Sequence, residues 1–328
     1  MSSSNASKLL VHGVSASKVG VPANTRLSAI DFLCTRFPAI QREVWLERFD
    51  AGRVLNAMGQ RIEPSLPLLG ETHLLYFREV TNESTLPFKA EIIFQDARLV
   101  VADKPHFMPV TPGGQYVQQS LLVQLKQQLN LPELSPIHRI DRETAGLVVF
   151  SVRAQDRDAY QALFRLRQVD KTYEAIAGVP ESSPLKLEFP LTHKSKMVED
   201  AQFFRMRELD SSDIDTSDSF NSETWIDCVE RLSSVSSESH LKNKSTPALA
   251  KYILKPLTGQ RHQLRVHMNA LGLPLIGDQF YPTVKRAAHE ADDFNLPLQL
   301  LAKTVSFKDP LTGVARIFES RQHLVLPA

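Results

Sequence analysis

The sequence predicts an α+β protein with a mostly antiparallel, mixed sheet and flanking helices, preceded by a small α/β module. Several short apolar runs bounded by turn residues indicate strands. Few segments have the apolar spacing of helices, and they do not alternate regularly with the strands, as a doubly wound parallel sheet would require. The 328 residues, 42% hydrophobic and 23% charged, fit one large domain and one small domain.

The N-terminal part of the chain forms the predicted small module. Apolar spacing indicates a helix around residues 27–37 and another around residues 44–49. The stretch AGRVLNAMGQRI then predicts a turn into a pair of strands. The polar tract TNESTLP, residues 81–87, ends in proline and predicts a linker. We therefore expect one domain over residues 1–85 and a second over residues 88–328.

The second domain opens with a predicted β-hairpin. Its two apolar runs, residues 92–94 and 99–101, flank a turn at Gln95 and Asp96. Ser120 then has the position of a helix cap. The helix after it is expected to bury one apolar face, made of Leu121, Leu122, Leu125 and Leu129.

Four further segments of this domain have clear patterns. GLVVFSV predicts a strand that is apolar on both faces, and KTYEAIAGV and TWIDCVERL predict two more strands. Between the first two, Ala159, Ala162, Leu163 and Leu166 predict a helix. Residues 208–221 and 233–247 are rich in Ser, Asp and Glu, and we expect two exposed acidic loops there.

The charge of the chain is unevenly distributed. Residues 208–238 carry nine acids and a single base, so the rest of the chain has an excess of nine bases although the whole has a net charge of only +1. That excess suits a polyanionic partner such as RNA, although scattered solubilising lysines give the same balance.

Several classes of protein are disfavoured. No run of 18 apolar residues is present, and MSSSNASKLL lacks the apolar core of a secretion signal, so we expect a cytoplasmic protein without membrane spans. Two distant cysteines predict no disulfide. No phosphate-binding glycine loop occurs. His262 and His267 lack a third ligand, so we expect no metal at that pair.

The run HRIDRETAGLVVFS, residues 138–151, concentrates charge directly before an apolar strand. Asp141 and Glu143 are a conceivable carboxylate pair for glycoside hydrolysis. Arg139 and Arg142, however, would keep Asp141 ionised rather than raise the pKa of one acid. Such a turn suits a site that needs a permanent carboxylate and also handles phosphate, and a purely structural charged turn stays open.

The longer string PIHRIDRETAGLVVFS resembles the HRLDRxTSGLLL signature of the RluA-type RNA pseudouridine synthases. EIIFQDARLVVADKPHFMPVTP is similar to the opening segment of that family, and FRLRQVDKTYEAIAGV is similar to its second motif. LKPLTGQRHQLRVHMNALGLPLIGDQFYP resembles the third motif, and PLQLLAKTVSFKDPLTG the closing segment. The resemblance covers residues 91–313, and residues 31–62 loosely resemble the S4-like RNA-binding module that often precedes this domain.

The resemblance implies the pseudouridine synthase fold and the isomerisation of uridine to pseudouridine without a cofactor or metal. It assigns catalytic roles to Asp141, Tyr173 and Arg265. Three roles are open for the aspartate: nucleophile at the sugar C1′, nucleophile at the base C6, or base at the 2′ carbon. Tyr173 is expected to stack on the target base, with its hydroxyl helping to deprotonate C5.

The expected substrate-binding residues lie in two of the motifs. They are His138, Arg139, Arg142, Arg261, His262 and Gln263. Arg139 is implied to fill the space of the flipped base, while His138 is expected to act by positioning. The TGR of the third motif is TGQ here, and Arg261 is expected to restore the phosphate contact from a strand.

Two rival functions remain at this stage. A non-catalytic RNA-binding protein on the same scaffold is the first, although the joint presence of Asp141, Tyr173 and Arg265 disfavours it. A glycosidase is the second, but both tryptophans lie outside the motifs. We expect rRNA or tRNA as partner, no membrane or protein partner, and a monomer.

Overall fold

The computed structural model describes residues 10–80, 83–201, 205–209, 219–232, 248–285 and 290–326. The chain divides into two compact units. The first unit joins Met1–Thr85 with Thr111–Leu134, and the second joins Leu86–Val110 with Ser135–Ala328. The expected boundary at residue 85 therefore recurs, but a segment expected in the larger domain belongs to the first unit.

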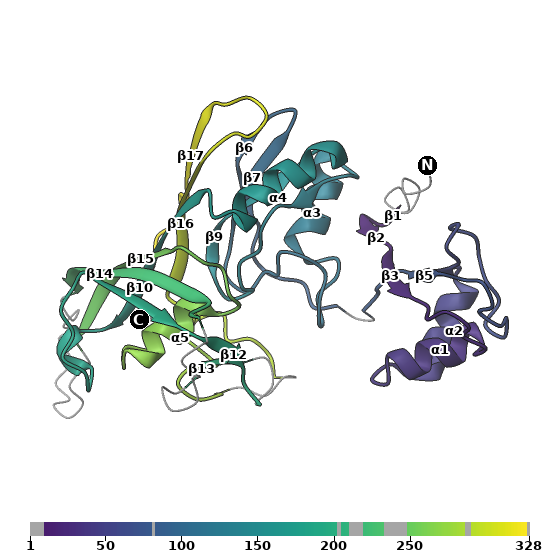
Figure 1. Ribbon diagram of the computed structural model, residues 1–328, viewed down its shortest axis with the longest axis horizontal. Coiled ribbons are helices and arrows are strands. Elements are labelled where there is room, and N and C mark those ends of the chain that lie inside the picture. Colours follow the sequence, from purple (N-terminus) through teal and green to yellow (C-terminus); the bar gives the residue numbers. More distant parts are fainter. Residues whose placement is uncertain are drawn as a thin grey trace. The chain divides into compact units, whose positions relative to one another are not determined.

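The first unit contains two small sheets and three helices in its described part (Figure 1). The order β3-β5-β4 makes one sheet, and β1 pairs with β2. The elements are β1 Leu10–Val11, β2 Val14–Ser15, β3 Ser17–Gly20, α1 Ala29–Arg36, α2 Arg42–Asp50, β4 Val54–Leu55, β5 His73–Tyr76 and α3 Leu121–Leu129. The predicted strand pair is reduced to β4 and a single bridge from Leu55 to Arg61.

Both predicted N-terminal helices form, and a central tryptophan packs them. Trp45 of α2 is fully buried, and its ring lies 5.6 Å from Phe37 and 5.5 Å from Tyr76. Helix α1 begins only at Ala29 because the Ser28 hydroxyl accepts the Asp31 amide at 3.2 Å and caps the first turn. Leu27 therefore lies outside the helix and is exposed.

The predicted buried face of the third helix is partly wrong. Ser120 takes the N-cap position, but its hydroxyl donates to the Val117 carbonyl at 2.8 Å instead of capping the helix. The buried residues of α3 are Leu121, Val123, Leu125 and Lys126. Leu122 and Leu129 are only partly buried. Val123 lies on another side of the helix from Leu121 and Leu125 and is buried in a separate cluster with Val14 and Val117.

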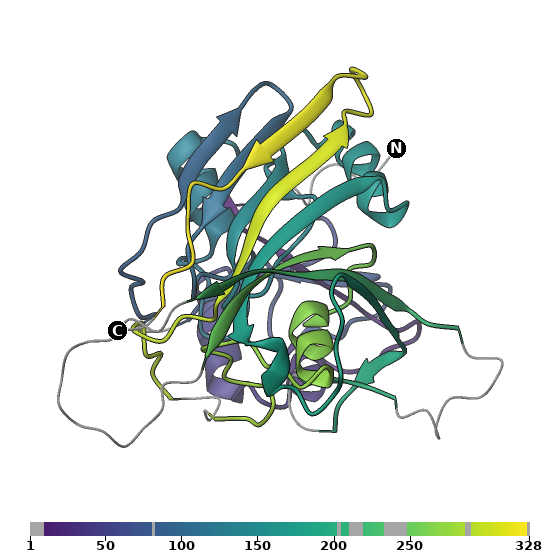
Figure 2. The ribbon, with the colours of Figure 1, turned by 90° about the vertical axis from the view of Figure 1, so that its left-hand side faces the viewer.

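The second unit is organised by one sheet of ten strands within its described part (Figures 1 and 2). The strand order is β11-β14-β15-β10-β16-β9-β7-β6, with β17 also paired to β16 and β8 to β9. Strand bounds are β6 Glu91–Gln95, β7 Leu99–Lys104, β8 Ser135–Pro136, β9 Ala145–Ser151, β10 Val169–Gly178, β11 Leu191–Ser195, β14 Ser222–Leu232, β15 Leu249–Pro256, β16 Leu300–Lys308 and β17 Ala315–Glu319. Only the β16–β9 pair is parallel among these, which confirms a mixed, mostly antiparallel sheet.

The remaining elements of the second unit are short. They are two 3₁₀ turns at Ala154–Asp156 and Pro180–Ser182, α4 Arg157–Arg165, α5 Gln263–Ala270 and the hairpin β12 Met197–Glu199 with β13 Met206–Glu208. Helix α4 buries Tyr160 and Leu163, whereas Leu166 lies beyond its end and is exposed. In Figure 2 the light-green α5 lies beside the green strands β14 and β15. Its Leu264 and Met268 pack against the Ile226 side of the sheet.

Strand β9 carries the chain away from the charged run and is buried along its whole length. The predicted hairpin of β6 and β7 pairs with it through β7. Gly146 of β9 has φ +109°, and a Cβ there would come within 2.3 Å of the Ala302 carbonyl oxygen. Only glycine permits this close approach of β9 to β16, which places the turn before β9 next to the centre of the sheet.

The two predicted acidic loops fall mostly outside the described residues. Residues 210–218 and 233–247 are not among them. Glu208, which we assigned to the first loop, instead ends β13, and the strand predicted from TWIDCVERL is β14. No helix in the described part of the chain is long and apolar enough to cross a membrane.

Candidate active site

The charged run forms a turn that ends at the buried strand β9. The amide of Thr144 donates to the Asp141 carbonyl at 3.2 Å and closes the turn. Lys104, fully buried at the end of β7, donates its ammonium to the Arg142 carbonyl at 3.1 Å. The His106 ring also bonds the Glu143 carbonyl, at 2.7 Å. Lys104 and His106 thus hold the backbone of the turn in place. The side chain of Asp141 is 24% exposed.

Arg265 of α5 reaches the carboxylates of this turn from the other side. Its Nη1 lies 3.3 Å from Asp141 Oδ2 and 3.6 Å from Glu143 Oε2. Its Nε and Nη2 each donate to one oxygen of Asp278 at 2.8 Å. Burial lowers the pKa of Arg265, but Asp278, Asp141 and Glu143 outweigh this and raise it. The guanidinium is therefore a permanent cation beside Asp141.

Glu143 is also held in its ionised form. Burial raises the pKa of its carboxyl, but the charges of Arg265 and Arg142 lower it by more. The pKa of Glu143 is therefore below its ordinary value. A glycosidase needs one carboxylic acid that stays protonated to donate to the leaving group. Since both arginines oppose protonation of Glu143, the geometry disfavours that rival function.

Tyr173 lies on the central strand β10, opposite Leu254 of β15 and Ala302 of β16. The ladder to β16 shifts register between Thr172 and Tyr173. Burial, and next the charge of Asp141, raise the pKa of the phenol. The neutral hydroxyl is therefore strongly favoured, and a neutral phenol is a weak base at neutral pH. The other role expected for Tyr173, stacking on the target base, needs no ionised hydroxyl.

His262 and Arg261 precede α5 in a turn, not on the strand that we expected for Arg261. His262 has φ 56°, its Nδ1 lies 3.1 Å from the Tyr281 hydroxyl, and its Nε2 lies 4.0 Å from Asp141 Oδ2. Burial lowers the pKa of His262 although Asp141 opposes this effect. Arg261 is half exposed and bonds Glu199 at 3.2 Å.

Two expected substrate contacts are engaged by the protein itself. The His138 ring stacks on Phe164 at 4.5 Å and accepts the Val149 amide at 3.1 Å, while burial lowers its pKa to about 3. Gln263 is 4% exposed, and its amide bonds Thr258, Gln260 and two groups of β14. The side chains of His138 and Gln263 therefore support the fold around the site.

Arg139 and Arg142, which lie on either side of Asp141 in the sequence, differ in their contacts and exposure. Arg142 forms a bidentate pair with Asp292, at 2.7 and 2.9 Å, and also bonds Glu143. Arg139 is exposed, and no hydrogen bond or ion pair is found for it among the residues that the structure describes. Arg139 therefore has the freedom that a base-replacing side chain requires, whereas Arg142 holds the turn to residues 290–296.

Sequence reasoning missed Asp278, although it lies in the quoted third motif. Besides its pair with Arg265, it accepts the Phe280 amide at 2.8 Å and the Tyr281 amide at 3.2 Å through Oδ1. Gly277 before it has φ +75°, and a Cβ there would meet the Pro297 carbonyl at 2.2 Å. The signal in the sequence that could have identified Asp278 is its position directly after Gly277, in the same motif as Arg265.

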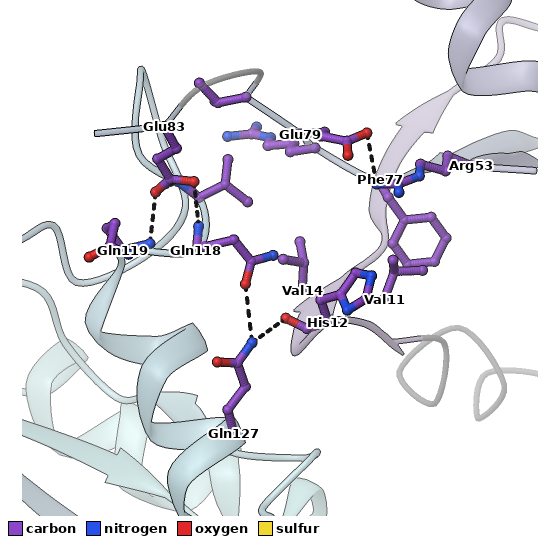
Figure 3. Close-up of a pocket in the computed structure, with 13 residues that line it drawn as sticks. Val11, His12, Val14, Arg53, Phe77, Glu79, Glu83, Gln118, Gln119 and Gln127 are labelled. Carbon is purple, nitrogen blue, oxygen red and sulfur yellow. Dashed lines mark hydrogen bonds and ion pairs between the residues drawn. The ribbon is translucent and has the colours of Figure 1, made fainter. Parts of the chain in front are cut away.

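The first unit contains a separate cavity of about 490 Å³ (Figure 3). Glu83 accepts three successive amides, from Val117, Gln118 and Gln119, at 2.7–2.8 Å. Arg53 pairs with Glu79 at 2.7 Å on another side. Internal partners thus satisfy these charges, and the cavity contributes none of the predicted catalytic residues.

Comparisons with known proteins show the family of this chain. A family model described as RNA pseudouridylate synthase matches residues 98–270, more than half of the chain, so the chain belongs to the RNA pseudouridine synthase family. It is thereby an isomerase that acts on RNA. Asp141, Tyr173 and Arg265 all lie within the matched residues.

Two curated relatives and one solved structure illustrate the likeness. The dual-specificity RNA pseudouridine synthase RluA of Escherichia coli is 27% identical over 70% of this chain and 91% of its own length. The mitochondrial pseudouridylate synthase RPUSD4 of Rattus norvegicus is 33% identical over 72% of this chain and 62% of its own length. Human RNA pseudouridylate synthase domain containing 1 superposes with a TM-score of 0.52 at 20% identity, over 73% of this chain and 91% of that chain, and confirms the fold.

Proposed function

We propose that this enzyme converts specific uridines of structured rRNA or tRNA to pseudouridine and that Asp141 is its catalytic carboxylate. The observation that carries the proposal is the array of Asp141, Arg265 and Asp278, in which a buried guanidinium faces a partly exposed carboxylate at 3.3 Å. All three roles open for the aspartate need the ionised form. Arg265 places a permanent positive charge 3.3 Å from this carboxylate.

The reaction moves one bond and exchanges one proton. The N1–C1′ bond of uridine breaks, the base turns over, and a C5–C1′ bond forms. The C5 proton is then lost while N1 takes up a proton, so the product is an isomer and no redox partner is needed. We propose that the Tyr173 ring stacks on the base and that Arg139 fills its vacated position.

We assign a contact with the RNA backbone to Arg261, whose half-exposed side chain has the required accessibility. His262, 4.0 Å from Asp141, is proposed to contact the bound nucleotide. Because RNA is recognised largely by shape and by unstacked bases, the choice among rRNA and tRNA sites depends on the loops around these residues.

Other parts of the proposal concern the whole protein. We propose that the N-terminal unit adds RNA affinity, that the chain is a monomer and that it acts in the cytoplasm. The free thiols of Cys34 and Cys228 suit a reducing compartment. Light scattering after size exclusion tests the monomer, and microscopy of a tagged protein tests the location.

Asp141→Asn tests the catalytic assignment. We expect no tritium release from RNA labelled at uridine C5, with RNA affinity within about tenfold of wild type because phosphate and stacking contacts remain. The matched control is Asp158→Asn, since Asp158 is 89% exposed on α4. Turnover retained in Asp141→Asn would refute the assignment. Mapping pseudouridine in cells that express wild type or Asp141→Asn then identifies the target RNA.

A further inference from the structure

A second cluster of polar side chains includes His267, two residues after Arg265 on α5, and none of the proposed catalytic residues. His193 of β11 bonds Glu208 of β13, with 2.8 Å between Nε2 and Oε1. The same Glu208 oxygen lies 3.9 Å from Nε2 of His267, and the two imidazole rings meet edge to face at 4.8 Å. His267 was considered above with His262, but the fold joins it to these two residues instead.

The three ligand atoms are already close together. They lie within 4.8 Å of one another. Zinc bonds histidine nitrogen at about 2.0–2.1 Å and carboxylate oxygen at about 2.0–2.2 Å, which puts the edge of a tetrahedral site near 3.3 Å. The observed separations of 2.8 and 3.9 Å fall on either side of that edge. Small side-chain rotations would therefore bring all three atoms to a common ion.

The cluster is buried on one side and open to water on the other. His267 is fully buried, and its Nε2 lies 3.0 Å from the Ser222 hydroxyl and 3.2 Å from the Ser195 hydroxyl, contacts that a bound ion would replace. His193 and Glu208 keep 21% and 20% exposure, so water reaches the open side of the cluster. Three ligands come from two strands and a helix, each anchored by its own pairing or packing.

We propose that His193, Glu208 and His267 bind one divalent cation of the zinc class, with water or a serine hydroxyl as fourth ligand. Two imidazoles and one carboxylate are a donor set that zinc accepts. The role is structural, because the ion would fasten β11 and β13 to α5, the helix that carries Arg265. The proposal is independent of the catalytic assignment, since no step of the reaction uses the ion.

The test uses the full-length, untagged protein after treatment with a chelator. Zinc sulfate is titrated by calorimetry, and cobalt chloride is titrated with visible absorption. We expect one zinc ion per chain, an intense tetrahedral cobalt spectrum and a melting temperature that rises with zinc, as selective binding to the folded state requires. Chelation should lower the melting temperature again.

His193→Gln and Glu208→Gln are the decisive variants, because each keeps a hydrogen-bonding side chain at a partly exposed position. Each should weaken zinc binding roughly tenfold or more and remove the cobalt spectrum, with unchanged circular dichroism. His323→Gln, at an exposed histidine, should bind like wild type. Absence of saturable zinc binding in the wild type would overturn the proposal, as would equal binding in all variants, which would place the ion elsewhere.

Discussion

Arg265 and Asp278 form a bidentate pair in which neither side chain has exposed area. Two of the three guanidinium nitrogens are committed to Asp278, at 2.8 Å each, so the plane of the group is fixed. The remaining nitrogen, Nη1, points to Asp141 and Glu143. Asp278 thus orients the cation beside Asp141, the proposed catalytic carboxylate.

Asp278→Asn should abolish most turnover and destabilise the fold. Removing one partner of a buried ion pair leaves an uncompensated charge and typically costs about 3–5 kcal/mol. Urea unfolding measures that cost, and tritium release on the folded fraction measures turnover. Wild-type turnover in Asp278→Asn would contradict the positioning role.

Arg265→Lys should also lose activity, which the same tritium-release assay measures. A single lysine ammonium cannot bind Asp278 through two nitrogens and contact Asp141 through a third, as the planar guanidinium does.

Tyr173→Phe should keep most of the RNA affinity and much of the rate. The ring still stacks, and the raised pKa of the hydroxyl disfavours its use as a base. Tyr173→Leu should lose both, with a loss of binding of about 1–3 kcal/mol, the range for base stacking on an aromatic side chain. Filter binding and single-turnover kinetics separate the two effects. A complete loss of rate in the phenylalanine variant would show that the hydroxyl takes part in chemistry.

Asp292→Ala should loosen the catalytic turn. The Asp292 carboxylate, whose side chain is 1% exposed, accepts hydrogen bonds from Nη1 and Nη2 of Arg142. Two residues further on, Phe294 packs edge to face on Phe107 at 5.2 Å. Loss of charged hydrogen bonds should cost about 1.5–3 kcal/mol of stability. We expect kcat to fall more than RNA affinity, because Arg142 adjoins Asp141. An unchanged kcat with lowered stability would limit Asp292 to a structural role.

Acid should destabilise the protein through buried neutral histidines. Burial lowers the pKa of His138 to about 3 and that of His106 to about 4, from 6.5. Below pH 6.5 these histidines therefore bind protons in the unfolded chain but stay neutral in the folded chain. The free energy of unfolding consequently decreases as the pH falls. Each group adds a slope of at most about 1.4 kcal/mol per pH unit between 6.5 and its folded pKa. Above pH 6.5 these two groups add no slope.

Urea unfolding at several pH values between 7 and 4 measures this dependence. His138→Gln should reduce the slope, because glutamine still accepts a hydrogen bond at this position but does not titrate. His323→Gln is the control, since that residue is exposed. A slope unaffected by His138→Gln would mean that other groups dominate the acid response.

The sequence by itself predicted the class of fold, most strands of the sheet, and Asp141 and Arg265 but not Asp278 of the proposed catalytic array. Strands β7 and β9 are buried on both faces, so their continuous apolar runs were readable without a structure. The motif strings pointed to Asp141, Tyr173 and Arg265, and the last two appear beside the first. Local patterns suffice where burial or a family signature constrains neighbouring positions.

Only the tertiary structure decided which charged residues meet. Arg139 and Arg142 lie only three positions apart in the sequence, yet Arg142 is bound to Asp292 and Arg139 is exposed. His262 reaches Asp141, whereas His267 joins His193 and Glu208. Side-chain partners on different strands depend on the register and packing of the whole sheet. A pattern along the chain contains neither the register nor the packing. Only the folded structure therefore shows which side chains of the site have protein partners and which are exposed.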